Sequence, residues 1–115
     1  MTRSLARCKD FDVGIEDHGI LVLFGHFEYD DGGCQGLGYC IDSSFLYRFL
    51  NVFDVEQLRG VNGKSCWVTH TDSGIEKIEP LHKKDGTPFA IPEWQEFVKR
   101  LKLPSPYEMR TGKKP

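Results

Sequence analysis

The stretch from residue 32 to residue 53 constrains the fold more than any other part of the chain. It begins as a glycine-rich turn, continues as a short apolar strand and ends in the most apolar helix of the sequence. The apolar residues of that helix recur with the helical repeat and form one stripe: Phe45, Leu46, Phe49, Leu50 and Phe53. Burial is worth about 1.5 to 3 kcal/mol for each large apolar side chain, so we expect this helix to supply much of the core.

Three strands are expected before this helix. Apolar and polar residues alternate over residues 11–15, which predicts a half-buried strand with residues 1–10 as its weak beginning. Residues 20–29 predict a longer strand, and residues 34–41 predict a third. Turn-forming residues at 16–19 and 30–33 join the three as an antiparallel meander.

Two further strands and a second long helix are expected after it. Residues 54–57 resemble a capping box that opens a short helical turn ending at Gly60. Residues 64–71 and 75–81 predict a hairpin, and residues 82–89 a polar loop. Pro92 suits the first position of a final helix whose apolar residues are Trp94, Phe97, Val98 and Leu101. The order β-β-β-α-β-β-α predicts an α+β fold, an antiparallel sheet with helices packed on it.

The size and composition are those of one globular domain. The 115 residues are 39% hydrophobic and 28% charged. We expect a single domain over residues 1–103 and a flexible basic tail over residues 104–115. No apolar run suits a signal peptide or a membrane span, which predicts a cytoplasmic protein whose four cysteines are reduced thiols.

Acidic residues are concentrated in the first predicted hairpin. Between residues 10 and 31 there are seven acids and no lysine or arginine: Asp10, Asp12, Glu16, Asp17, Glu28, Asp30 and Asp31. An acidic surface attracts a cationic partner and speeds the encounter with it. These residues are therefore the predicted protein-binding site, and the alternative is an ordinary solvated hairpin rim.

The C-terminal part has the opposite charge. Residues 91–115 hold six basic and three acidic residues, whereas residues 1–90 hold nine basic and fourteen acidic ones. The basic residues are Lys99, Arg100, Lys102, Arg110, Lys113 and Lys114. They favour an alternative function, electrostatic binding of nucleic acid. Basic residues also suit the C-terminal end of any helix, which is the simpler explanation.

No motif has a decisive catalytic, cofactor or metal spacing. Gly36 and Gly38 lack the third glycine of a dinucleotide-binding turn, and we expect them to let a helix or a ring pack against bare backbone. The cysteines and histidines have no close C-x-x-C spacing. A small-ligand or catalytic site at the glycine-rich turn is a further alternative, with Cys34 or His18 as its polar group. The leading expectation is a non-enzyme that needs no cofactor or metal.

The arrangement of motifs resembles a family of small uncharacterised proteins encoded by tailed phages and prophages. The resemblance covers roughly residues 11–81 and rests on patterns spread over the two hairpins and the helix between them: residues 16–19 (EDHG), 36–42 (GLGYCID), Phe45-Leu46, Phe49-Leu50, Val52, Leu58, Gly63-Lys64, 66–68 (CWV), Ile75 and Ile78. Family members often carry an extra glycine before the tyrosine and a longer insertion before the helix, and this chain has neither. The resemblance implies an accessory protein of the bacterial host cytoplasm that binds a host or phage macromolecule.

Overall fold

The computed structural model describes residues 1–16, 20–40 and 43–101. Its elements follow one another as β1 (Thr2–Glu16), β2 (Ile20–Tyr29), β3 (Cys34–Cys40), α1 (Ser43–Phe53), the 3-10 helix η2 (Leu58–Gly60), β4 (Ser65–Thr71), β5 (Gly74–Pro80), the 3-10 helix η3 (Lys83–Asp85), β6 (Phe89–Ala90) and α2 (Ile91–Leu101). All strand pairs are antiparallel, and the sheet order is β3-β2-β1-β4-β5-β6. The predicted α+β class is confirmed.

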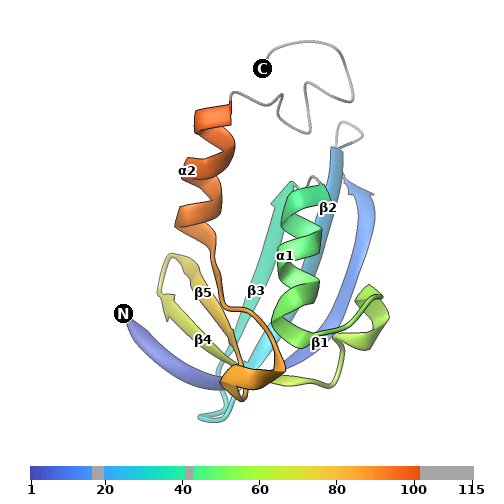
Figure 1. Cartoon of the computed structure of the whole chain (residues 1–115). Coiled ribbons are helices and arrows are strands. Elements are labelled where there is room, and N and C mark those ends of the chain that lie inside the picture. The colour runs from blue at the N-terminus through green and yellow to red at the C-terminus, as the bar shows by residue number, and fades with distance from the viewer. Residues whose placement is uncertain (17–19, 41–42, 102–115) are drawn as a thin grey trace.

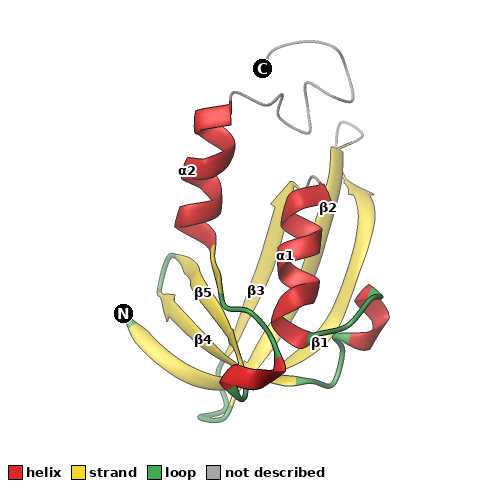
Figure 2. Cartoon of the chain, viewed as in Figure 1, coloured by secondary structure: helices red, strands yellow, loops and turns green. Residues whose placement is uncertain are grey.

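The helix α1 lies along one face of the sheet, and α2 stands beside it near β5 (Figures 1 and 2). The predicted stripe faces inward, because Phe45 and Phe49 are fully buried and Phe53 nearly so. These rings contact the aromatic side chains of other elements: Phe49 packs on Phe11 of β1, and Phe45 packs on Phe89. The core therefore sits between α1 and the sheet.

The strand β1 confirms that the strand predicted over residues 11–15 begins within residues 1–10. Its first half turns small residues such as Ala6 and Cys8 toward the core, and this weakens the apolar signal although both are buried. The register with β2 shifts between Lys9 and Asp12, and Asp10 there has a φ of 57°. This bulge bends the strand, so that its first half pairs with both β2 and β4 while its second half pairs with β2 alone.

The edge of β1 beyond the end of β4 is closed by one side chain. Asn62 Oδ1 accepts a hydrogen bond from Phe11 N at 2.7 Å, and Asn62 Nδ2 donates to Phe11 O at 3.1 Å. The amide thus takes the place of a neighbouring strand at this point.

Side chains link strands that are not neighbours in the sheet. Gln35 of β3 donates from Nε2 to the carbonyl oxygen of Thr71 at the end of β4, at 3.0 Å. Tyr29 of β2 donates to Gln35 Oε1 and stacks on His70 of β4. Since β3 and β4 are not neighbours in the sheet order, these contacts show that the sheet curls around its core.

Several local predictions are wrong. The segment predicted as a loop contains η3 and the two-residue strand β6, which is too short to leave a periodic pattern. The capping box is not formed: Gln57 makes no capping hydrogen bond with its side chain, and Asp54 instead has a φ of 51° directly after α1. Helix α2 begins at Ile91, one residue before Pro92.

Helix α2 is tied to the start of α1. Trp94, predicted to be apolar core, is 8% exposed and packs edge-on against Phe45. Its ring nitrogen donates to Ser44 Oγ at 2.9 Å. Among the residues that the structure describes, no helix is both long enough and apolar enough to cross a membrane.

Candidate functional site

The described acidic residues of the first hairpin are spread along the β1–β2 ladder. Glu16 lies opposite Ile20 at one end of the β1–β2 ladder, whereas Asp30 and Asp31 follow Tyr29 at the other end. At about 3.3 Å per residue, the length of β2 separates these ends by roughly 30 Å. Asp17 and the side chain of Glu16 lie outside the described residues.

Most of the described acids in this set have partners within the fold. Glu28 Oε1 forms an ion pair with Lys9 Nζ at 2.8 Å, and Asp10 Oδ2 lies 3.8 Å from His26 Nδ1. The hydrogen bond from Lys9 lowers the pKa of Glu28 and raises the pKa of Lys9. Asp12 and Asp31 accept hydrogen bonds from nearby backbone N–H groups. These contacts account for the acids as parts of strand ends, a bulge and a turn.

The glycines of β3 do not admit close packing, and that prediction is wrong. Both Gly36 and Gly38 are exposed; a Cβ at Gly38 would meet nothing within 4 Å, and one at Gly36 would meet only a backbone oxygen at 3.8 Å. The close approaches occur at Gly25, beside Phe11, and at Gly86, beside Val52. Cys34 is exposed, as expected of that thiol, and His18 lies outside the described residues.

The basic C-terminal residues cannot be assigned to a surface. Lys99 and Arg100 belong to α2, but their side chains lie outside the described residues, as do Lys102, Arg110, Lys113 and Lys114. Nucleic-acid binding by this segment stays a prediction.

Two of the cysteines, Cys8 and Cys66, pack against each other in the core. Cys8 and Cys66 are fully buried neighbours, and their hydrogen bond, together with burial, raises the pKa of the Cys8 thiol. A buried thiol held in its protonated form is a poor nucleophile. No group of three or more possible metal ligands is found in the part of the chain that the structure describes.

The structure also brings Ser4 and His70 together, a pair that the sequence analysis missed because the residues lie on different strands. Ser4 Oγ and His70 Nε2 are 3.0 Å apart, and the ring of Tyr29 covers the imidazole at 4.3 Å. The described residues place no carboxylate within hydrogen-bond reach of His70 to orient it as a catalytic base. The pair is explained as a polar contact that joins β1 to β4.

A hollow lies on the outer side of α1. It has a volume of about 680 Å³ and is lined by Tyr47, Leu50, Asn51, Asp54, Val55 and Glu56, and it is called here the Tyr47 pocket. Tyr47 is 70% exposed, although large aromatic side chains are usually buried. Leu50 and Val55 are partly buried against the core and form an apolar floor.

The electrostatic character of the Tyr47 pocket is negative. Neither Asp54 nor Glu56 has an ion-pair partner within 4 Å among the described residues. Asp54 follows the last residue of α1, where unpaired carbonyl groups give the helix a partial negative charge. No basic residue occupies the last turn of α1 to offset that charge. The pocket is thus suited to a cationic group.

A signal for this pocket is present in the sequence. Tyr47 lies off the apolar stripe of α1, so an aromatic residue is expected on the polar face of an amphipathic helix. The position of Asp54 and Glu56 beside it depends on how the chain turns after α1, which the incorrect capping box misplaced.

Comparisons with protein families, with curated proteins and with solved structures gave no match to this chain, and the resemblance to phage proteins stays a prediction.

Proposed function

We propose that the protein is a non-catalytic binding module that docks a cationic segment of a partner protein in the Tyr47 pocket. The observation that carries this proposal is an exposed aromatic ring beside two carboxylates that have no ion-pair partner within 4 Å among the described residues. An accessory phage protein of the host cytoplasm is the setting that the sequence resemblance suggests for it.

The chemistry of the pocket fits an arginine or lysine side chain. Such a side chain has an aliphatic stem and a charged head, so the stem can cover Leu50 and Val55 while the head reaches Asp54 and Glu56. The ring of Tyr47 can also hold a guanidinium or ammonium group over its face. The end of α1 adds attraction to the same head group.

The surrounding surface extends the contact. A second hollow of about 320 Å³ shares Val55 and Glu56 with the Tyr47 pocket and continues past Gln57 to Gly60. Arg59 lines this second hollow and limits its negative charge. A partner segment that follows both hollows would therefore place its cationic residue in the first.

A titration with defined peptides tests this function. The probe is a short arginine-rich peptide, and the matched neutral probe is the same peptide with citrulline in place of arginine. We expect the arginine peptide to shift the amide NMR signals around Tyr47 and Val55 and the citrulline peptide to leave them in place. Because exposed ion pairs contribute about 0.2 to 1 kcal/mol each, the Asp54→Asn, Glu56→Gln double variant should bind about two- to thirtyfold more weakly.

The control removes the same charge from the first hairpin. Asparagine tolerates a positive φ at position 54, so the Asp54→Asn, Glu56→Gln variant of the Tyr47 pocket should remain folded. The Asp30→Asn, Asp31→Asn variant loses two exposed acids of the β2–β3 turn and should bind the arginine peptide like the natural protein. If the Asp30→Asn, Asp31→Asn variant loses binding and the variant of the Tyr47 pocket keeps it, the acidic hairpin is the docking site and the assignment to the Tyr47 pocket is wrong.

A further inference from the structure

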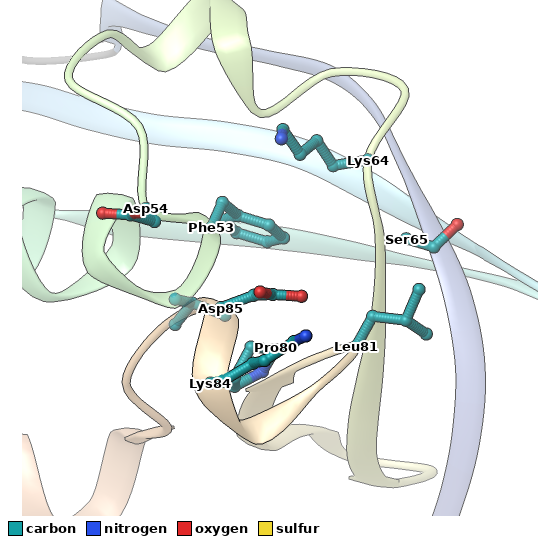
Figure 3. Close-up of a pocket in the computed structure, with 9 residues that line it drawn as sticks. Phe53, Asp54, Lys64, Ser65, Pro80, Leu81, Lys84 and Asp85 are labelled. Carbon is teal, nitrogen blue, oxygen red and sulfur yellow. The ribbon is translucent and has the colours of Figure 1, made fainter.

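A cavity separate from the two hollows described above lies at the end of α1, between that helix, the start of β4, the end of β5 and η3 (Figure 3). Its volume is about 370 Å³, within the range of small-molecule sites. Figure 3 shows the side chains of Lys84 and Asp85 directed into the cavity and Lys64 extending over it, whereas Asp54 points away. It is called here the lysine pocket.

One wall of the lysine pocket is held firmly in place. The loop after η3 approaches the end of α1 so closely that a Cβ on Gly86 would clash with the carbonyl oxygen of Val52. The next residue, Thr87, donates its N–H to the carbonyl oxygen of Asn51 at 2.9 Å. The wall is therefore formed before any ligand arrives, which lowers the entropy lost on binding.

The two lysines come from separate elements, and both line the cavity. Lys64 precedes β4 and Lys84 belongs to η3. Among the described residues, neither forms an ion pair within 4 Å. Two ammonium groups on one cavity suit the multiple oxygen atoms of a phosphate or a carboxylate.

The remaining side chains narrow the class of ligand. Asp85 places a carboxylate beside the lysines, and this repels a bare anion but accepts a hydrogen bond from a hydroxyl group. Phe53 and Pro80 are buried, and together with Leu81 they give the pocket an apolar surface for C–H groups. A suitable ligand thus combines an anionic head, hydroxyl groups and a compact carbon skeleton.

We infer that the lysine pocket binds a small hydroxylated anion of the sugar phosphate or sugar acid class. The anionic head lies between Lys64 and Lys84, and a hydroxyl group donates to Asp85. This proposal does not rest on the docking function: Asp54 lines both cavities, but the lysine pocket takes a ligand of the opposite charge.

The test is an NMR titration of the full chain with four probes: ribose 5-phosphate, gluconate, inorganic phosphate and ribose. Ribose 5-phosphate or gluconate should give saturable shifts near Lys64, Lys84 and Gly86. Inorganic phosphate, which lacks the carbon skeleton, should bind more weakly, and neutral ribose should not bind. If ribose 5-phosphate binds more tightly, the preferred head group is a phosphate; if gluconate does, it is a carboxylate.

Neighbouring lysines supply the matched variants. Lys83 and Lys84 are both exposed in η3, but only Lys84 lines the cavity. Lys84→Gln and Lys64→Gln should each weaken binding of the preferred probe by about 1.4- to fivefold, while Lys83→Gln should leave its affinity unchanged. Equal losses in Lys83→Gln and Lys84→Gln would show general charge attraction and overturn the inference, as would the absence of saturable shifts with both hydroxylated anions.

Discussion

Gly86 and Gly38 show how differently two glycines can constrain the same fold. Gly86 has no room for a side chain, because the backbone of Val52 occupies the position of its Cβ. Gly38 faces open space on an exposed face of β3. The close packing that the sequence suggests for β3 therefore occurs in the loop after η3 instead.

Alanine substitutions measure this difference. Gly86→Ala should lower the free energy of unfolding by about 1 to 3 kcal/mol, because the loop must move away from α1. Gly38→Ala should change it little, since a methyl group meets no neighbour and alanine restricts the unfolded chain. Urea denaturation of both variants gives the comparison. A larger loss for Gly38→Ala than for Gly86→Ala would contradict the observed packing.

Tyr29, whose hydroxyl donates to Gln35, makes the stability of the fold depend on pH in the alkaline range. Burial, followed by the nearby Cys66, raises the pKa of Tyr29 to about 12. The unfolded side chain ionises near about pH 10, so the unfolded state loses its proton first as pH rises. The folded state is then favoured fully below about pH 10, and this contribution is lost as the pH rises through the folded-state pKa.

The Tyr29→Phe variant isolates this effect. It should be less stable than the natural protein at neutral pH, because its ring cannot donate to Gln35 Oε1. Its stability should also fall less steeply between pH 9 and pH 11, measured by chemical denaturation at each pH. Tyr47→Phe serves as the exposed control. If the stability of Tyr29→Phe fell with pH as steeply as that of the natural protein, ionisation of Tyr29 would not be the cause of the alkaline loss of stability.

At the scale of elements, β1 is the strand on which the architecture depends. It pairs with β2 along most of its length and with β4 over residues 2–7, and its bulge at Asp10 allows this change of partners. The half without a second partner strand would leave an open edge at Phe11. Asn62 closes that edge with two hydrogen bonds.

Removing this amide tests its role. Asn62→Ala should lower the free energy of unfolding by about 1 to 2 kcal/mol, because Phe11 loses both hydrogen bonds and gains only partial access to water. Amide hydrogen exchange at Phe11 should become faster. Asn51→Ala replaces another exposed asparagine, whose side chain makes no hydrogen bond to the residues that the structure describes, and should change neither quantity appreciably. Unchanged exchange at Phe11 in Asn62→Ala would show that the edge is protected by other contacts.

At the scale of the whole molecule, the end of α1 separates two surfaces of opposite character. The Tyr47 pocket presents Asp54 and Glu56 on one side, and the lysine pocket presents Lys64 and Lys84 on the other. The helix ends at Phe53, and Asp54 then turns the chain with its positive φ. The same local conformation thus shapes one wall of each pocket, which explains why both lie at the same point of the fold.

The sequence by itself determined the α+β class, the hairpins and the buried stripe of α1, because these depend on periodicity and on turn residues close together in the chain. It missed β6 and the positive φ of Asp54, whose local signals are short or weak. Only the tertiary structure gave the acids of the first hairpin their partners and placed Lys64 and Lys84 on one cavity, since strand register and long-range packing decide which distant residues meet.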